Sequence, residues 1–323
     1  MQVRELQDGC RVETALLVRS VEARRRREGG EYLKLTLGDR TGSVSAVVLE
    51  EVDAARGVCC AGEVVHVTGS FTVHPQFGAR VLVETVRAAG EDDYEPHHLL
   101  DGPAHPAEQM ESDLRELIAT VQHPDLRRLL DAVLGEGSPT WQCFREAPAA
   151  KHYHEAYRHG LLEHSLTVAQ AVSAISATFP GIDRDVAVTG ALLHDIGKLD
   201  VYELRGEAIE MSDQGKLYGE IALGYYRVRS AIESLGDFRS EAAHAVLHII
   251  LSHHGSLEFG SPVVPSTREA TLVHMIDNLG ARLGSFDRLE KGLPAGAQWS
   301  AFDKGIGGGA YFAAAGADER RAA

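Results

Sequence analysis

Two hydrophobic patterns divide this chain of 323 residues. Along residues 11–90, apolar and polar residues alternate in short runs, and the clearest run is Tyr32–Leu37, which ends at the turn 38–42. From residue 111 onward, apolar residues recur every three or four positions. Alternation is typical of half-buried strands, and the longer spacing is typical of amphipathic helices. We therefore expect a β-rich N-terminal part and a helical C-terminal part.

The β-rich part has the size of a small barrel. Turns that contain Gly and Asp interrupt it about every ten residues, which is typical of short strands. Five strands in about 80 residues fit an OB-fold. The stretch Tyr32–Val44 resembles the corresponding part of nucleic-acid-binding OB domains. We therefore expect an all-β OB-fold barrel over residues 1–90.

Basic and aromatic residues of this barrel are candidates for contacts with nucleic acid. Four consecutive arginines fall between the first two expected strands, where an OB-fold places a binding loop. Aromatic rings in such a domain can stack on bases. The candidate contacts are Arg24, Arg25, Arg26, Arg27, Tyr32, Phe71 and Phe77. The alternatives are a solvated basic loop and aromatic side chains that pack in the barrel core.

The rest of the chain is expected to be an all-α bundle that follows a linker. Residues 91–110 are acidic and contain prolines, which predicts a linker. Helices are expected near 160–178, 184–197, 217–235, 239–253 and 268–284, with a hairpin or loop over 199–216. The helical domain is expected over 111–300, followed by a Gly- and Ala-rich flexible tail over 301–323.

Charge and hydropathy narrow the classes of partner. The net charge is −15, and residues 1–90 contain 12 Lys or Arg and 12 Asp or Glu, so the excess acid lies in residues 91–323. This balance argues against a protein that coats duplex nucleic acid by charge alone, although a neutral barrel with a basic cluster can hold a polyanion. No run approaches the ~18 apolar residues of a membrane span. Since no secretion signal is visible either, we expect a cytoplasmic protein without a membrane partner, and the sequence leaves a homo-oligomer open.

Histidines and acids lie within apolar runs of the helical part. His194 and Asp195 follow Ala191–Leu193, His164 shares a helical stripe with apolar residues, and Asp277 lies between apolar residues. Burying such groups without a partner is costly. Imidazole nitrogens and carboxylate oxygens together form a ligand set for Zn, Mn, Fe or Ni. We therefore expect a metal site built from His164, His194, Asp195, His253, His254 and Asp277.

Other interpretations of these residues remain. His164 taken alone is also compatible with an ordinary core histidine. His244 and His248 are four residues apart and form an alternative metal-binding pair. Lys198 either balances the dipole at a helix C-terminus or reaches a substrate phosphate.

The order His, His-Asp, Asp resembles that of the HD-domain phosphohydrolase superfamily. The flanking segments are similar to those of the YhaM-type 3′-5′ exoribonucleases, which carry an OB-fold before the HD domain. The segments that carry this resemblance are Pro148–Lys151, His154–Tyr157, His159–Ser165, Ala191–Lys198, Leu251–Gly255 and His274–Asn278. With the domain order, the resemblance extends over residues of about 10–285.

The resemblance implies a Mn-dependent exonuclease that degrades single strands from the 3′ end to nucleoside 5′-monophosphates. It implies one or two divalent ions, with Fe, Ni or Mg as alternatives to Mn, held by the ligands named above. Asp195 would be a catalytic residue, and Lys198 and His154 would lie near the scissile phosphate. The choice between single-stranded RNA and DNA stays open, because stacking in OB-folds tolerates both.

Two positions depart from the family pattern. Glu220 stands where the family usually has a metal-binding histidine, and Tyr153 replaces one histidine of the usual pair before the entry segment. Glu220 is still a candidate metal ligand, and its harder oxygen favours Mn or Mg; the alternative is that it weakens a second metal site. Two other functions therefore stay open: a phosphohydrolase of small nucleotides with a regulatory OB domain, and a non-catalytic nucleic-acid-binding scaffold.

Overall fold

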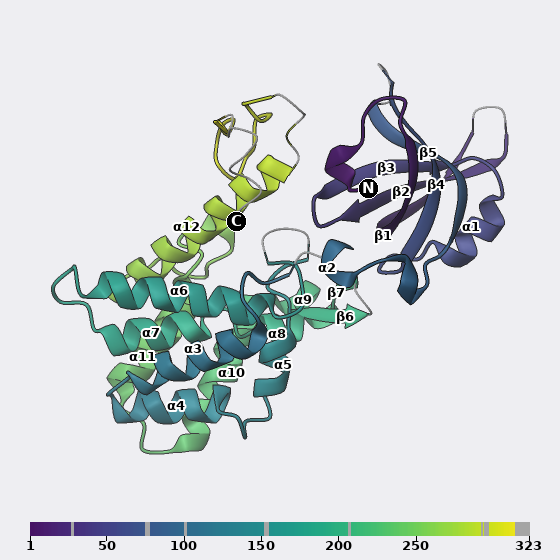
Figure 1. The fold of residues 1–323 in the computed structure, drawn as a ribbon. Helices are drawn as coiled ribbons and strands as arrows, with labels where there is room; N and C mark the ends of the chain where they lie inside the picture. Colours follow the sequence, from purple (N-terminus) through teal and green to yellow (C-terminus); the bar gives the residue numbers. More distant parts are fainter. Residues whose placement is uncertain are drawn as a thin grey trace. The chain divides into compact units, whose positions relative to one another are not determined.

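The computed structural model describes residues 1–26, 29–74, 78–99, 102–151, 155–205, 208–291, 293 and 297–313 (Figure 1). Its contacts form two compact units. The first consists of Met1–Asp101, Arg205–Ala208 and Phe286–Ala323, and the second consists of Gly102–Leu204 and Ile209–Ser285. Each unit has its own hydrophobic core.

The first unit contains a closed five-stranded barrel. Its strands are β1 (Arg11–Arg25), β2 (Glu31–Asp39), β3 (Gly42–Val48), β4 (Val64–His74) and β5 (Gly78–Ala88), with the helix α1 (Val52–Val58) between β3 and β4. The strands close in the order β1-β2-β3-β5-β4, and each neighbouring pair is antiparallel except β3 and β5. The expected OB-fold barrel is thereby confirmed.

Alternation along β2 decides which side chains fill this barrel. Leu33, Leu35 and Leu37 are buried in the barrel core. The residues between them, such as Lys34, are partly exposed, because successive side chains of a strand point to opposite faces. The strand therefore presents an apolar face to the core and a polar face to solvent.

The second unit is built from helices, as the spacing of apolar residues predicts. Its longer helices are α3 (Ala107–Ala119), α4 (Pro124–Leu134), α6 (Gly160–Ser176), α7 (Arg184–Leu193), α10 (Glu220–Leu235), α11 (Ser240–Ser252) and most of α12 (Arg268–Lys291); the shorter ones are α5 (Trp141–Glu146), α8 (Lys198–Val201) and α9 (Asp213–Tyr218). Residues 186–193 of α7 are buried without exception, so this helix lies inside the bundle. Among the described helices, none has both the length and the apolar character needed to cross a bilayer.

Helix ends near the expected metal ligands differ from the sequence-based expectation. α7 ends at Leu193, residues 194–197 form a turn, and Lys198 begins α8. Lys198 therefore lies at the start of a separate short helix and not directly after the last turn of α7. The helix expected over 217–235 begins at Glu220, because Gly219, with φ +74°, separates it from α9.

The remaining connections contain more local structure than a linker and a flexible tail would. The segment 91–110 includes two short helices, η2 (Glu91–Asp93) and α2 (Pro96–Leu99), and the start of α3. The segment 199–216 contains the hairpin β6 (Tyr202–Arg205) and β7 (Ala208–Met211), as one of the two expected alternatives. In the tail, Trp299 forms a bridge with Tyr311, and Asp303 forms one with Gly308. Residues 314–323 lie outside the described part.

Gly197 marks a close approach of backbones beside the expected metal ligands. A Cβ atom on Gly197 would lie 2.0 Å from the carbonyl oxygen of Glu220 and 2.5 Å from the backbone nitrogen of Gly224. Because these are backbone atoms, no side-chain rotation can make room. The absence of a side chain therefore lets the turn that carries His194 and Asp195 meet the start of α10.

We expect Gly197→Ala to lower the free energy of unfolding by about 1–3 kcal/mol, the usual cost of overpacking. Gly280→Ala is the matched control, because a Cβ on this glycine of α12 meets nothing within 4 Å, and the change should stabilise the helix by about 0.5–1 kcal/mol. Urea denaturation of the two variants and the wild type measures both effects. A Gly197→Ala protein as stable as the wild type would contradict the close approach.

Candidate metal centre

Imidazoles and carboxylates from several helices of the second unit meet in one buried cluster. α6 contributes His164, and the turn after α7 contributes His194 and Asp195. α12 contributes Asp277, and the end of α11 contributes His253. Four of these, His164, His194, Asp195 and His253, are buried. The structure therefore brings together residues that are more than 100 positions apart in the chain.

His164 lies at the middle of the cluster. Its Nε2 is 3.1 Å from His194 Nε2, 3.2 Å from Asp195 Oδ2 and 3.2 Å from Asp277 Oδ1. His194 Nε2 lies 3.4 Å from Asp195 Oδ2 and 3.8 Å from Asp277 Oδ1. One donor atom from each of His164, His194 and Asp277 can be chosen so that all three lie within 4.8 Å of one another, which is compact enough for a single cation.

Helix ends orient two of the imidazoles in the same way. His194 follows α7 and His253 follows α11, and each is the C-cap residue of its helix. His194 Nδ1 lies 2.7 Å from the carbonyl oxygen of Ala191, and His253 Nδ1 lies 2.8 Å from that of Ile250. A carbonyl oxygen can only accept, so each Nδ1 carries the proton and donates it to an otherwise unpaired helix-end carbonyl. The Nε2 atoms are thereby directed into the cluster.

A carboxylate that the sequence analysis does not identify orients the third imidazole. Glu155 is buried, and its Oε2 lies 2.8 Å from His164 Nδ1. Its backbone has a positive φ of 60°, and a Cβ on Gly160 would lie 2.1 Å from its carbonyl oxygen. Carboxylates commonly hold the far nitrogen of a metal-binding histidine in this way. An acid nine positions before a histidine carries no periodic signal, so only the tertiary structure reveals the pair.

The charges in the cluster stabilise one another. Burial by itself lowers the pKa of His194, but Asp195 and Asp277 outweigh it and raise that pKa to about 9. Burial raises the pKa of Asp195, yet Lys198 and the histidines hold it well below its usual range. The pKa of Asp277 is likewise held low by His164 and His194. Asp195 and Asp277 are therefore ionised. Their negative charges stabilise positive charge on the neighbouring imidazoles or on a bound cation.

Two buried atoms of the cluster have no hydrogen-bond partner among the described residues. They are Asp195 Oδ1 and His253 Nε2, which face each other at 3.5 Å. A buried polar atom without a partner costs about 1–3 kcal/mol. Since both atoms are electron-pair donors, a cation satisfies both and a further hydrogen-bond acceptor satisfies neither. The donor set of nitrogen and oxygen therefore fits a divalent metal of the Mn, Fe or Zn type.

A second group of polar side chains adjoins this cluster through Asp195. His254 Nε2 lies 3.2 Å from Glu220 Oε1, and its ring centroid is 4.4 Å from that of His253. Lys198 Nζ lies 2.6 Å from Asp195 Oδ2. Asp195 thus presents Oδ2 to Lys198 and to the histidines around His164, and Oδ1 to His253. Asp195 therefore contacts both the cluster around His164 and Lys198 of the second group.

Not every candidate of the helical part lies in the cluster. His154 lies outside the described residues. The alternative ligand His248 accepts a hydrogen bond from the backbone nitrogen of Ser266 at 2.8 Å, so its Nε2 is engaged elsewhere. His274 contacts the backbone next to the cluster, since its Nδ1 lies 2.7 Å from the carbonyl oxygen of His253.

The structure corrects several expectations about the barrel. Arg24 and Arg25 lie in β1 and not in the following loop, because the strand continues to Arg25. Arg24 is paired with Glu22 at 2.6 Å and lies opposite Tyr32 in the sheet. Phe71 is buried in the barrel core, so the prediction that it stacks on bases is wrong.

The other barrel candidates have mixed outcomes. Arg26 follows β1, and its side chain donates a hydrogen bond to the carbonyl oxygen of Leu49. Tyr32 is partly exposed in β2. Arg27 and Phe77 lie outside the described residues.

A family model and a solved structure are similar to parts of this chain. The HD domain family matches residues 161–282, which include every residue of the cluster except Glu155. A crystal structure of a domain of replication protein A from Methanococcus maripaludis is similar with a TM-score of 0.24 and 20% sequence identity, covering 27% of this chain and 92% of that one.

Similarity to curated proteins extends over most of the sequence. The 3′-5′ exoribonuclease YhaM of Geobacillus sp. (strain WCH70) is 32% identical over 290 residues, which cover 88% of this chain and 87% of the relative. The 3′-5′ exoribonuclease YhaM of Bacillus subtilis (strain 168) is 29% identical, with coverage of 88% and 90%. With an OB-fold barrel, an HD domain and this degree of identity, the chain belongs to the YhaM 3′-5′ exoribonuclease family.

Proposed function

We propose that this protein is a divalent-metal-dependent exonuclease that hydrolyses single-stranded RNA from the 3′ end and releases nucleoside 5′-monophosphates. The observation that carries the proposal is the buried cluster around His164, in which Asp195 Oδ1 and His253 Nε2 lack partners among the described residues. Membership in a family of exoribonucleases supports the choice of substrate and direction. Mn is the proposed ion, because three of the seven ligands are carboxylates, which favour harder cations.

The proposed ligands are His164, His194, Asp195, Glu220, His253, His254 and Asp277. A divalent ion held by them supplies a Lewis acid that polarises the phosphodiester and makes water a nucleophile at neutral pH. The positions of the protein groups around the ion determine which bond is cleaved. Glu155 and the backbone carbonyls of Ala191 and Ile250 keep the imidazoles oriented before a substrate arrives.

Lys198 is the proposed partner of the substrate phosphate. Its ammonium group lies 2.6 Å from Asp195 Oδ2, and its side chain is only 15% exposed. Burial by itself lowers the pKa of Lys198, but Asp195 and Glu220 raise it above its usual value, so the group stays charged. A fixed cation beside the ligands can offset the charge that develops on the phosphoryl oxygens. His154 is proposed for the same task on the family resemblance alone.

The barrel is the proposed holder of the strand away from the cleaved end. Tyr32, Lys34 and Thr36 alternate with the buried leucines of β2, so they lie on its outer face. OB-folds bind nucleic acid on this face of strands 2 and 3 and with the loop before it. Arg24 lies opposite Tyr32 and extends the same face. Stacking and a few cations suit an enzyme that must move along any sequence.

The experiment that tests the function is a nuclease assay on matched RNA and DNA oligomers. With 5′-labelled single strands and Mn, we expect the wild type to give a ladder that shortens from the 3′ end. His194→Ala should reduce the rate at least about 100-fold, as losses at metal sites commonly do. His248→Ala, a change on α11 outside the cluster, should not. Full activity of His194→Ala would remove the proposed metal centre.

A second prediction concerns Glu155. Glu155→Gln keeps a hydrogen-bond acceptor for His164 Nδ1 but removes the charge, so metal affinity should fall about tenfold; Glu155→Ala should cost about 100-fold. Glu163→Gln is the control, because Glu163 lies on α6 next to His164 and pairs with Tyr157 instead. Titration with Mn by calorimetry measures the three affinities. Equal affinities in all three variants would show that Glu155 does not orient a ligand.

A third prediction concerns Glu220, the residue that departs from the family. Glu220→His replaces a carboxylate by a softer imidazole, so the ratio of Zn to Mn affinity should rise about tenfold. The pair with His254, at 3.2 Å, indicates that the replaced group faces the centre. Competition between Zn and Mn, followed by metal analysis of the dialysed protein, gives this ratio. An unchanged ratio would exclude Glu220 from the ligands.

A further inference from the structure

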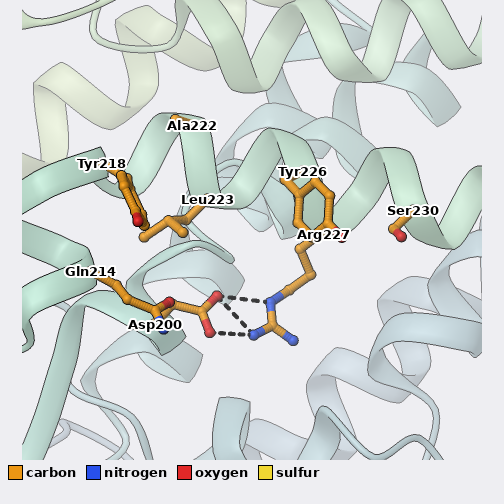
Figure 2. A pocket seen from close by; sticks show the side chains of 8 residues that line it. All are labelled: Asp200, Gln214, Tyr218, Ala222, Leu223, Tyr226, Arg227 and Ser230. Carbon is orange, nitrogen blue, oxygen red and sulfur yellow. Dashed lines mark hydrogen bonds and ion pairs between the residues drawn. The ribbon is translucent and has the colours of Figure 1, made fainter.

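A groove on the second unit lies outside the cluster (Figure 2). Its volume is about 840 Å³, and it runs between α10 on one side and α8 and α9 on the other. The lining residues are Asp200, Gln214, Tyr218, Ala222, Leu223, Tyr226, Arg227 and Ser230. None of them is a proposed metal ligand, and none was a candidate in the sequence analysis.

Two tyrosine rings line this groove and are largely in solvent. Tyr218 is 61% exposed and Tyr226 is 72% exposed. Other rings of the helical unit, such as those of Phe144 and Trp141, are buried instead. An exposed flat ring offers an apolar face without the desolvation cost of a charged group. Such rings are typical platforms for nucleic-acid bases.

A fixed guanidinium forms the polar part of the groove. Arg227 binds Asp200 through two nitrogens: Nη2 lies 2.7 and 2.8 Å from the two carboxylate oxygens, and Nε lies 3.3 Å from Oδ2 (Figure 2). Within the described part of the chain, Nη1 of Arg227 does not bind Asp200. The ion pair neutralises the local charge and holds the guanidinium still. The groove therefore offers N–H donors in a fixed orientation without a net charge that would select phosphates.

The elements that form the groove also form the metal centre. α8 begins with Lys198 and carries Asp200, two residues further along. α10 begins with Glu220 and carries Tyr226 and Arg227, and six residues of helix correspond to about 9 Å along the axis. A strand whose phosphate lies at Lys198 and Glu220 can therefore follow α10 into the groove within a length of one or two nucleotides.

We propose that this groove binds the bases of single-stranded RNA next to the phosphodiester that is cleaved. Tyr218 and Tyr226 stack on the bases, and Arg227 Nη1 donates to a sugar or base oxygen. The proposal rests on the proposed exonuclease function and adds a substrate subsite to it. A second copy of the chain is the rival occupant, and the oligomeric state of the tyrosine variants tests it.

The test compares substitutions of the two tyrosines on a short RNA. We expect Tyr218→Ala and Tyr226→Ala each to raise KM for a 5′-labelled tetranucleotide about tenfold, within the range of losses seen when a stacking ring is removed. Tyr226→Phe keeps the ring and should restore the wild-type KM. Phe179→Ala removes a ring outside the groove that is also largely exposed, at 57%, and should leave KM unchanged. The affinity for Mn, measured by calorimetry, should be the same in every variant, because neither tyrosine is a proposed metal ligand.

Two further measurements separate this proposal from its rivals. Fluorescence anisotropy with the tetranucleotide and the full chain in EDTA reports binding without hydrolysis. If the alanine variants bind the tetranucleotide more weakly in EDTA, the groove is supported whether or not the wild type cleaves RNA. Failure of the wild type to cleave RNA would contradict the proposed exonuclease function and not the groove. Unchanged KM and binding in Tyr226→Ala, or a change of its oligomeric state by light scattering, would overturn the proposal.

Discussion

The arrangement of the helical unit depends on one buried carboxylate. Asp195 is 3% exposed, and its charge is stable there only because Lys198 lies at 2.6 Å and His164 and His194 lie at 3.2 and 3.4 Å. Removing a charge from water costs several kcal/mol unless such partners are in place. These partners balance Oδ2 only, whereas Oδ1 faces the unpartnered nitrogen of His253. The fold thus provides a site that becomes fully satisfied with a cation.

Ordinary helix chemistry holds this site in shape. His194 and His253 directly follow the last residues of α7 and α11, where unpaired carbonyls need donors, and each imidazole supplies one through Nδ1. The same hydrogen bond that completes the helix therefore fixes the tautomer and the direction of an imidazole of the cluster. Gly197 then lets the turn that carries Asp195 approach the start of α10, where Glu220 lies. Stability and function share these contacts, so changes in the turn should affect both.

The two units deal with a polyanionic substrate by different physical means. The barrel is neutral overall and offers an outer strand face with a tyrosine and a lysine. The remainder of the chain carries the whole net charge of −15, which suits a unit that must hold cations. An acidic unit can bind RNA only where a metal, a fixed lysine or aromatic rings outweigh the general repulsion. The groove beside α10, with its internal ion pair and two exposed rings, meets this condition.

The sequence by itself determined the two-part architecture and most of the cluster. Alternation in β2 and helical spacing after residue 111 are local patterns, and a histidine or acid inside an apolar run shows locally that it needs a partner. Glu155, the strand position of Arg24 and the core position of Phe71 were decided only by the tertiary structure. The surroundings of each of these three residues depend on which distant segment packs against it, and the local spacing of apolar and polar residues does not indicate that segment. The groove of Tyr218 and Tyr226 was likewise decided only by the tertiary structure, because the exposure of a ring depends on how the molecule packs and not on the residue type.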